Sequence, residues 1–364
     1  MRIVSVVGAR PQFIKAAPVC RALRAAGHDE VLVHSGQHFD HAMSQVFFDE
    51  LGIPAPDHNL GVAGGSHGAM TGQMLELLER LFVEVAPDTV LVYGDTNTTL
   101  AAGLAAAKIH IPVAHVEAGL RSFNRAMPEE INRVLTDHLS ELLFCPTEIA
   151  VANLAAEGIT DGVHQVGDVM LDAARHHAEH ADPAKAAARY GLTPGGYYLA
   201  TVHRAATADD PVALAGVVEA FASLDLPVLW PVHPRTRKAL ESGGLASRDA
   251  VGSGADAAGS SALRLVEPLS YVETNALLRG AAALLTDSGG MQKEAYFFAV
   301  PCVTLREETE WVETVEAGWN RLAGTDPARI AEAVSAVRSG EPPSERPAFY
   351  GDGHAAEEIA RVLG

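Results

Sequence analysis

Short apolar runs alternate with helical stretches along this chain, and that alternation constrains its fold more than any other feature. The first run, RIVSVV at residues 2–7, begins almost at the N-terminus of a chain of 364 residues. Such alternation is typical of parallel sheets whose strands are joined by helices. The sequence therefore predicts an α/β protein. In the first half we expect strands at residues 2–7, 30–34, 89–93, 113–115, 142–144 and 163–166, and helices at 13–26, 70–85 and 97–109.

A polar, alanine-rich stretch at residues 168–188 separates this series from a second one. The length suits two domains, so we expect two Rossmann-like domains, residues 1–170 and 171–351, facing each other across a cleft. One single large sheet is the alternative. A turn and a closing helix are expected at residues 352–364. The second series of strands is expected at residues 197–202, 228–231, 263–266, 283–286 and 302–305, with a loose surface loop at 240–259.

Composition narrows the class of partner. The formal net charge of −19 argues against nucleic acid, and no apolar run approaches the roughly 20 residues that span a bilayer. A strand at the very start leaves no room for a signal peptide. The three cysteines are far apart and follow no metal-binding spacing. We therefore expect a cytoplasmic protein without a metal site.

Acidic and basic side chains gather after two of the expected strands. The segment at residues 115–133, HVEAGLRSFNRAMPEEINR, contains Glu117, Glu129 and Arg133, and Asp95 ends the strand before it. Ligands bind at the carboxyl ends of strands in open α/β sheets. Carboxylates beside cations suit proton transfer on an anionic substrate. Asp95 is either a base of such a site or the N-cap of the next helix.

Two other strand ends resemble anion sites. GARPQFIK places Arg10 and Lys15 near a helix N-terminus, whose amide groups attract phosphate, although both can equally be solvated surface charges. In TDSGGMQKEA, a serine and two glycines precede a second helix, where Glu294 could accept hydrogen bonds from ribose hydroxyls. The plainer interpretation is a glycine turn with a serine N-cap. The residues that would bind a diphosphate there are Ser288, Gly289 and Gly290.

Histidines end two strands of the second series. His203 and Arg204 follow ATV, and an imidazole at this position can donate a hydrogen bond or a proton to a departing phosphate oxygen. His233 lies between two prolines in WPVHP. Each histidine can instead be a structural residue at the end of its strand.

Taken together, GARPQFIK, GDTNTT, HVEAGLRS, MPEEINR, HR, PVHP, TDSGG and YGDG resemble the non-hydrolysing UDP-N-acetylglucosamine 2-epimerase family. The motifs keep their order from the first strand to the last helix. The resemblance implies the GT-B fold, with the C-terminal helix crossing back onto the first domain. It also implies a homodimer, and neither a metal nor a nicotinamide cofactor.

The resemblance further implies a reaction on a UDP-sugar. The proton on carbon 2 has no adjacent carbonyl, so the family eliminates UDP to give a glycal and then adds UDP back after reprotonation. Carried over by motif, the acid and base candidates are Asp95, Glu117 and Glu129, with His203 nearest the diphosphate. Crowded carboxylates raise one another's pKa, which suits shared acid and base duty. The implied substrate and UDP ligands are Arg10, Lys15, Arg133, Arg204, Ser288, Gly289, Gly290, Glu294 and Arg306.

The sequence departs from the family pattern at several positions. Ala206 stands where a glutamate usually follows the HR pair, and Trp311 stands where an arginine is expected. Bacterial members also use a second UDP-N-acetylglucosamine as activator. Gln37 and His233 match its contacts, but an Arg-Gln pair expected near residues 66–67 is missing. The hypothesis is that such activation is weak or absent.

These departures leave the substrate open. HSGQHFDH and LREETEWVE resemble the subgroup that acts on UDP-2,3-diacetamido-2,3-dideoxyglucuronate, whose extra carboxylate Arg121 or Arg125 could bind. A hydrolysing relative that releases UDP and N-acetylmannosamine is another alternative, and a GT-B glycosyltransferase a weaker one. Outside the enzymes, a UDP-sugar sensor that has lost catalysis fits the same motifs. The leading interpretation is interconversion of UDP-N-acetylglucosamine and UDP-N-acetylmannosamine.

Overall fold

The computed structural model describes residues 1–36, 52–179, 181–245, 251–252, 263–340, 343 and 345–364. The chain forms two compact units. Unit 1 comprises Met1–Arg175 and Ala348–Gly364, and unit 2 comprises His176–Pro347. Each unit has its own seven-stranded sheet, so the alternative of one large sheet is wrong.

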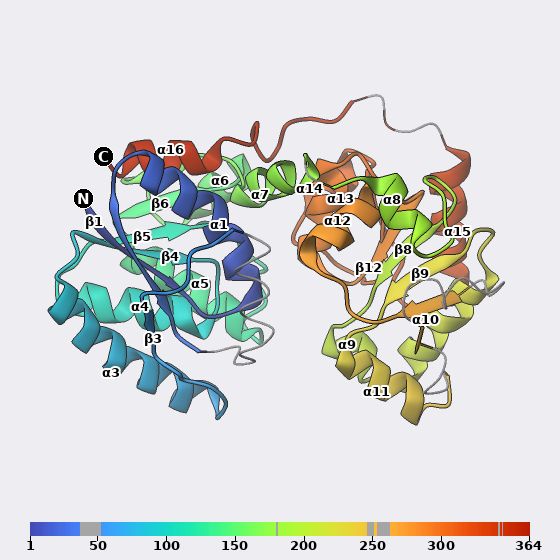
Figure 1. Ribbon diagram of the computed structural model, residues 1–364, viewed down its shortest axis with the longest axis horizontal. Helices are drawn as coiled ribbons and strands as arrows, with labels where there is room; N and C mark the ends of the chain where they lie inside the picture. The colour runs from blue at the N-terminus through green and yellow to red at the C-terminus, as the bar shows by residue number, and fades with distance from the viewer. Residues whose placement is uncertain (37–51, 180, 246–250, 253–262, 341–342, 344) are drawn as a thin grey trace. The chain divides into compact units, whose positions relative to one another are not determined.

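The sheet of unit 1 is parallel, with the order β3-β2-β1-β4-β5-β6-β7 (Figure 1). The strand order reverses beside β1, which pairs with both β2 and β4. The loops after β1 and β4 therefore begin at a topological switch point, where open α/β sheets bind ligands. The strands are β1 (Arg2–Val7), β2 (Asp29–His34), β3 (His58–Asn59), β4 (Thr89–Tyr93), β5 (Val113–Val116), β6 (Leu142–Cys145) and β7 (Val163–Gln165).

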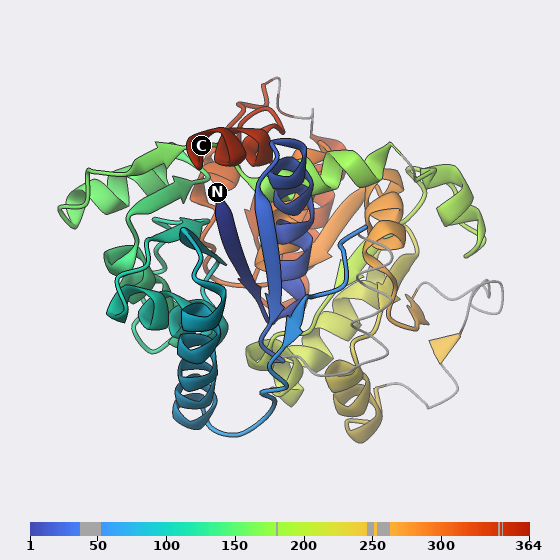
Figure 2. The same cartoon turned by 60° about the vertical axis from the view of Figure 1, so that its left-hand side comes forward.

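Helices cover both faces of this sheet. The last helix returns to the first, because α16 packs against α1 (Figure 2). Asp168 also donates its N–H to the Tyr350 carbonyl, which ties the returning segment to the end of the first series. The helices are α1 (Arg10–Ala25), α3 (His67–Val85), α4 (Asn97–Lys108), α5 (Pro128–Leu139), α6 (Glu148–Ala156), α7 (Val169–Ala178) and α16 (Ala355–Val362).

Unit 2 repeats the design with the order β10-β11-β9-β8-β12-β13-β14, and its switch point lies between β8 and β12. The strands are β8 (Tyr198–Thr201), β9 (Val228–Pro231), β10 (Val251–Gly252), β11 (Leu263–Val266), β12 (Ala283–Thr286), β13 (Cys302–Thr304) and β14 (Asn320–Leu322). The helices are α8 (Pro183–Ala188), α9 (Ala205–Ala208), α10 (Pro211–Ser223), α11 (Pro234–Ser242), α12 (Tyr271–Gly280), α13 (Gly289–Phe297), α14 (Val312–Glu316) and α15 (Pro327–Ser339).

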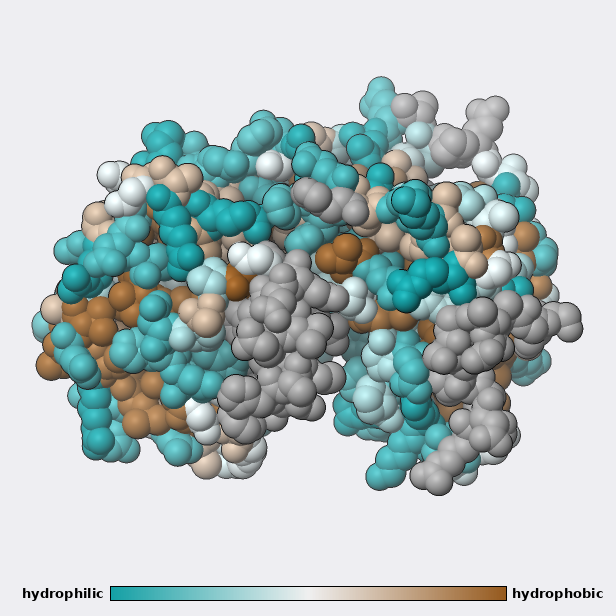
Figure 3. All heavy atoms as spheres, viewed as in Figure 1, coloured by the Kyte–Doolittle hydropathy of each residue, from teal (hydrophilic) through white to brown (hydrophobic). Residues whose placement is uncertain are grey.

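The central strands of both sheets are buried on their two faces. The central strands β1 and β4 are mostly apolar and their valines and leucines are fully buried, as expected for strands covered by helices on each side. Apolar atoms also show on the outside of unit 1 over α3 and α4 (Figure 3). Within the described ranges, none of the helices combines the length and the apolar composition of a bilayer span.

Each of the expected strands agrees with the structure to within one residue at either end. The expected loop at residues 240–259 begins inside α11, which ends at Ser242, and most of its remainder lies outside the described residues. Three short strands were not expected: β3, β10 and β14. Each has only two or three residues, too few for a periodic pattern to stand out.

Candidate active site

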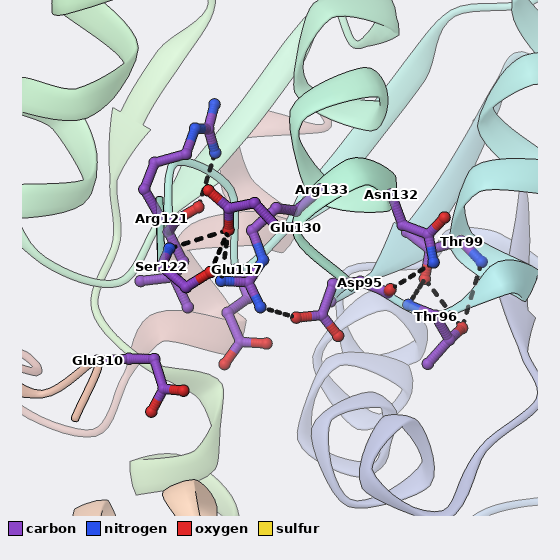
Figure 4. Close-up of polar contacts among 12 residues, drawn as sticks. Asp95, Thr96, Thr99, Glu117, Arg121, Ser122, Glu130, Asn132, Arg133 and Glu310 are labelled. Carbon is purple, nitrogen blue, oxygen red and sulfur yellow. Dashed lines mark hydrogen bonds and ion pairs between the residues drawn. The ribbon is translucent and has the colours of Figure 1, made fainter. Parts of the chain in front are cut away.

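The turn after β4 presents Asp95 at the switch point of unit 1. Gly94 adopts φ +62°, and Arg133 of α5 forms an ion pair with the Asp95 carboxylate (Figure 4). Asn132 donates its side-chain N–H to the Asp95 carbonyl at 2.9 Å. The N-cap of α4 is Thr96, whose hydroxyl accepts the Thr99 N–H at 3.3 Å. The interpretation of Asp95 as a helix cap is therefore wrong, and its carboxylate is engaged by a cation instead.

Glu117 directly follows the neighbouring strand β5, in a backbone conformation that costs energy. Its φ of +73° lies in the left-handed region, which residues other than glycine rarely occupy. Strain of this kind gathers at functional sites, where the surrounding structure holds it in place. Here the Glu117 and Ala118 N–H groups both donate to the Phe144 carbonyl at 3.1 Å, and the carboxylate forms an ion pair with Lys15 of α1.

The turns that carry Asp95 and Glu117 lie against each other. A Cβ added to Gly94 would stand 3.3 Å from both the Glu117 carboxylate and the Lys15 ammonium. Burial raises the pKa of Asp95 even though 31% of its side-chain surface is exposed, and Glu117 adds to that effect. Arg133 and Lys15 oppose it. The result is a pair of carboxylates with two cations, and one of the acids retains its proton more readily than usual.

The two glutamates of MPEEINR differ in their surroundings. Glu130 is buried, and its carboxylate accepts hydrogen bonds at 2.9 Å from the Ser122 N–H, the Ser122 hydroxyl and the Phe123 N–H (Figure 4). It also lies 3.3 Å from Arg133. Glu129 is exposed in the first turn of α5. Glu130 therefore holds the turn at residues 122–123, while Glu129 is accessible for a reaction.

Arg121 and Arg125 also differ. The Arg121 guanidinium donates to both oxygens of Glu157, at 2.7 and 2.8 Å, and to Asp137 at 2.6 Å. It is buried and fully engaged, so it is not available for a substrate carboxylate. Arg125 is exposed, and the hypothesis of carboxylate recognition in this segment now rests on Arg125 alone.

At the switch point of unit 2, a buried aspartate that the sequence analysis overlooked holds the turn after β8. Asp287 accepts the His203 N–H at 3.1 Å and the Arg204 N–H at 3.0 Å, and the His203 ring nitrogen Nδ1 lies 3.7 Å from it. The His203 ring is 6.2 Å from that of His233, which caps α11 through the Arg235 N–H at 3.2 Å. The only sequence signal was the position of Asp287 at the end of β12.

The N-terminus of α13 follows directly. Ser288 is its N-cap, with the hydroxyl 3.5 Å from the Met291 N–H, which agrees with the plainer interpretation of this serine. Gly290 has open space where a Cβ would stand, whereas a Cβ on Gly289 would meet the Trp311 indole at 3.4 Å. Glu294 is buried in the second turn of α13. The first amides of a helix have no partner within it, so this end suits an anion.

Beside this helix, Arg306 is tied to an acid. Both of its terminal nitrogens donate to Glu310 at 3.0 Å, and Arg204 lies 3.7 Å from the same carboxylate. Burial alone would raise the pKa of Glu310, but the two arginines lower it. Trp311 covers the buried Lys293 ammonium at 4.3 Å from the ring centre. An anion that binds Arg306 must therefore compete with Glu310.

Two sequence-predicted residues cannot be placed. Gln37 lies outside the described residues, as does the side chain of Arg10. The others fall into two groups, each assembled within one unit. Lys15, Asp95, Glu117, Glu129 and Arg133 belong to unit 1, and His203, Arg204, His233, Ser288, Gly289, Gly290, Glu294 and Arg306 belong to unit 2.

Two doubly wound parallel units, each with polar side chains at its switch point, define an α/β protein of the GT-B class. Comparison with known proteins narrows this class. Residues 21–364 match the family described as UDP-N-acetylglucosamine 2-epimerase, to which this chain belongs. The resemblance drawn from the sequence motifs is confirmed.

Several relatives are similar over their whole length. A UDP-N-acetylglucosamine 2-epimerase homolog of Methanococcus maripaludis is 47% identical, over all of this chain and 99% of its own. The UDP-2,3-diacetamido-2,3-dideoxy-D-glucuronate 2-epimerase of Pseudomonas aeruginosa is 46% identical, with the same coverage. The crystal structure of the Methanocaldococcus jannaschii UDP-GlcNAc 2-epimerase, in complex with UDP-GlcNAc and UDP, has a TM-score of 0.88 at 40% identity and covers all of this chain and 99% of that one.

Proposed function

We propose that this protein is a non-hydrolysing epimerase that interconverts UDP-N-acetylglucosamine and UDP-N-acetylmannosamine. The observation that carries the proposal is the pair of adjoining turns in unit 1, where Asp95 and the strained Glu117 each face a cation. Paired carboxylates at a switch point suit removal and return of a proton. Membership of the family supports the choice of reaction.

The reaction has two halves. In the first, a carboxylate takes the proton from carbon 2 while the bond between carbon 1 and the UDP oxygen breaks, which leaves a glycal with a double bond between these carbons. In the second, an acid returns a proton to the opposite face of carbon 2, and the UDP oxygen re-forms its bond to carbon 1. Asp95, Glu117 and Glu129 are the proposed acids and bases.

Unit 2 would stabilise the leaving group. The Ser288 turn and the first amides of α13 offer hydrogen-bond donors to a diphosphate, and the helix dipole favours its charge. His203 is held by its backbone on Asp287, so its 44%-exposed ring can approach the departing oxygen. Arg204, Arg306 and Glu294 complete the proposed ligands, joined by Lys15, Arg133 and Arg10 from unit 1.

Proton NMR in deuterated water tests the proposal. The purified protein is incubated with UDP-N-acetylglucosamine, and the expected product is UDP-N-acetylmannosamine with deuterium at carbon 2. Free UDP with N-acetylmannosamine would assign the protein to the hydrolysing alternative. If UDP binds tightly but neither this sugar nor its diacetamido-uronate relative reacts, the sensor is the better account.

A second candidate substrate is UDP-2,3-diacetamido-2,3-dideoxyglucuronate. It is favoured by the Pseudomonas aeruginosa relative and by the exposed Arg125, which lies in the sequence between Glu117 and Glu129. If this sugar is the substrate, Arg125→Ala should lower kcat/KM for the uronate about tenfold or more and leave that for UDP-N-acetylglucosamine unchanged. Equal effects on both sugars would remove the support for this candidate.

We also propose a cytoplasmic homodimer. The family resemblance supports the dimer, as do the apolar atoms exposed over α3, including Val83 at 69% exposure. The three cysteines are free and buried, which suits a reducing compartment. Light scattering at several concentrations should give twice the chain mass. Replacing Val83 with glutamate should shift the mass toward that of one chain if α3 forms the interface.

A further inference from the structure

A buried histidine joins the two turns that carry the acids of unit 1. His115 lies in β5, two residues before Glu117, and none of its surface is exposed. Its Nε2 is 2.7 Å from the Gly94 carbonyl, in the residue just before Asp95. The Gly94 N–H in turn donates to the Val116 carbonyl at 3.0 Å. The peptide groups around Asp95 are therefore hydrogen-bonded to β5, the strand that directly precedes Glu117.

The other ring nitrogen of His115 faces a carboxylate. Nδ1 lies 2.7 Å from one oxygen of Asp137, and the second oxygen accepts the Gly119 N–H at 3.1 Å and an Arg121 N–H at 2.6 Å. Burial opposes the charge of Asp137, but its bonds to His115 and Arg121 lower its pKa. Both ring nitrogens are thus held in place, one by the Gly94 carbonyl and the other by the Asp137 carboxylate.

We propose that His115 is a positioning residue that sets the distance between Asp95 and Glu117 during the proposed 2-epimerisation, with Asp137 orienting its ring. The strain at Glu117 explains why such a device is needed. A left-handed residue at a strand end persists only when its surroundings hold it, and the adjoining turn is part of those surroundings. The kinetic consequences of this inference rest on the proposed function. The hydrogen bonds of His115 to Gly94 and Asp137 are a property of the folded chain.

His115→Phe keeps the ring and removes both hydrogen bonds. A displacement of a catalytic group by about 1 Å can lower the reaction rate about 10²-fold. We therefore expect kcat to fall by about that factor while UDP affinity stays unchanged. A glycal that waits longer for its proton escapes more often. The fraction of turnovers that release UDP and glycal should therefore rise about tenfold. This fraction does not depend on how much of the protein is folded, so mere loss of stability leaves it unchanged.

Asp137→Asn is the conservative comparison. The asparagine oxygen can accept from Gly119 and Arg121, and its amide can donate to an unprotonated Nδ1, so Nε2 still donates to Gly94. The released fraction should stay near that of the wild type. Ser5→Ala removes a different buried bond of unit 1, to Glu30 at 2.8 Å, and serves as the control for stability alone.

Hydrogen exchange separates this inference from the proposed function. In His115→Phe the amides of residues 94–99 should exchange about tenfold faster, and in Asp137→Asn they should not. This holds whichever UDP-sugar is the substrate. The inference is overturned if His115→Phe leaves both exchange and the released fraction unchanged, or if Asp137→Asn or Ser5→Ala alters them as strongly. If the two variants show the expected exchange rates but the wild-type protein does not epimerise a UDP-sugar, the result contradicts the proposed function and not the role of His115.

Discussion

Glu117 and Lys15 bring a proposed base and a cation together in the folded protein, and their side chains are only 9% and 12% exposed. We expect Glu117→Gln to lower kcat by about 10²–10⁴-fold, because general acid and base groups contribute rates of this size. UDP affinity, measured by calorimetry, should change little, since the amide retains the shape of the side chain. Glu148→Gln, an exposed change at the start of α6, is the control. Collapse of UDP binding in Glu117→Gln would make this residue structural.

Residue chemistry was only partly predictable from the sequence. Charged residues after strands indicated the acid-bearing turns, since the ends of parallel strands meet at one edge. Some roles were not predictable, namely those of Asp137, Asp287 and Glu130. A carboxylate that is buried to bind backbone amides is the same residue type as one that reacts, so the sequence does not distinguish the two. Arg121 was considered as a ligand for a substrate carboxylate because the sequence does not show that it binds Glu157, which lies 36 positions away.

At the scale of elements, the return of α16 to unit 1 depends on a buried acid. Asp172 of α7 accepts the Ala356 N–H at 2.8 Å at the start of α16. Burial raises the pKa of Asp172 from 3.8 to about 6, and Glu357 and Asp168 add to this effect. The folded protein binds this proton more tightly than the unfolded chain does. Protonated Asp172 therefore contributes its full stabilisation of the folded state below about pH 3.8. This stabilisation is lost as the pH rises through 6.

Asp172→Asn should therefore stabilise unit 1 at high pH. The amide oxygen keeps the bond to Ala356 without a buried charge, so the free energy of unfolding relative to the wild type should increase by about 2–3 kcal/mol between pH 4 and pH 8. Urea denaturation at several pH values measures it. Asp161→Asn, an exposed change, should show no such trend. A constant difference across this range would mean that Asp172 stays charged without penalty.

The turn after β5 makes a second prediction for an element. Gly119 has φ +80°, and a Cβ there would approach the Ala150 carbonyl oxygen to 2.3 Å. Gly158 has nearly the same φ, +82°, with nothing within 4 Å. Gly158→Ala should cost about 1 kcal/mol of stability from backbone strain alone. Gly119→Ala should cost several times more, because α6 must also move. Urea denaturation measures the free energy of unfolding of both variants. Similar losses of stability in the two would mean that the turn after β5 adjusts to the added Cβ at little cost.

Elements were more predictable than their ends. Central strands such as β1, β4 and β12 stand out because burial on both faces favours mostly apolar residues. The short β3 and β14 depend on their neighbours for pairing and contain polar residues. Helix starts were misplaced by up to three residues, since α1 begins with Arg10 and Pro11, which periodicity alone does not include.

At the scale of the whole molecule, each unit has its own sheet and core, so each can unfold as a cooperative body. The proposed UDP ligands at α13 all belong to unit 2. UDP at about 100 times its Kd should therefore stabilise unit 2 by about 2.7 kcal/mol, since a ligand shifts only the equilibrium of the body that binds it. Differential scanning calorimetry should show two transitions, and UDP should raise that of unit 2 more than that of unit 1, because most of the proposed UDP ligands belong to unit 2.

Ser288→Ala identifies the transition that moves. Loss of the Ser288 N-cap weakens the N-terminus of α13, whose amides are proposed to bind the diphosphate. The variant should therefore need about tenfold more UDP for the same shift of the transition temperature. Asp326→Ala removes the N-cap of α15, also in unit 2, and should lower the same transition without changing the response to UDP. If UDP raises both transitions equally in the wild type, the nucleotide binds residues of both units with comparable strength. Lys15 and Arg133 would then carry as much of the diphosphate as the turn at Ser288.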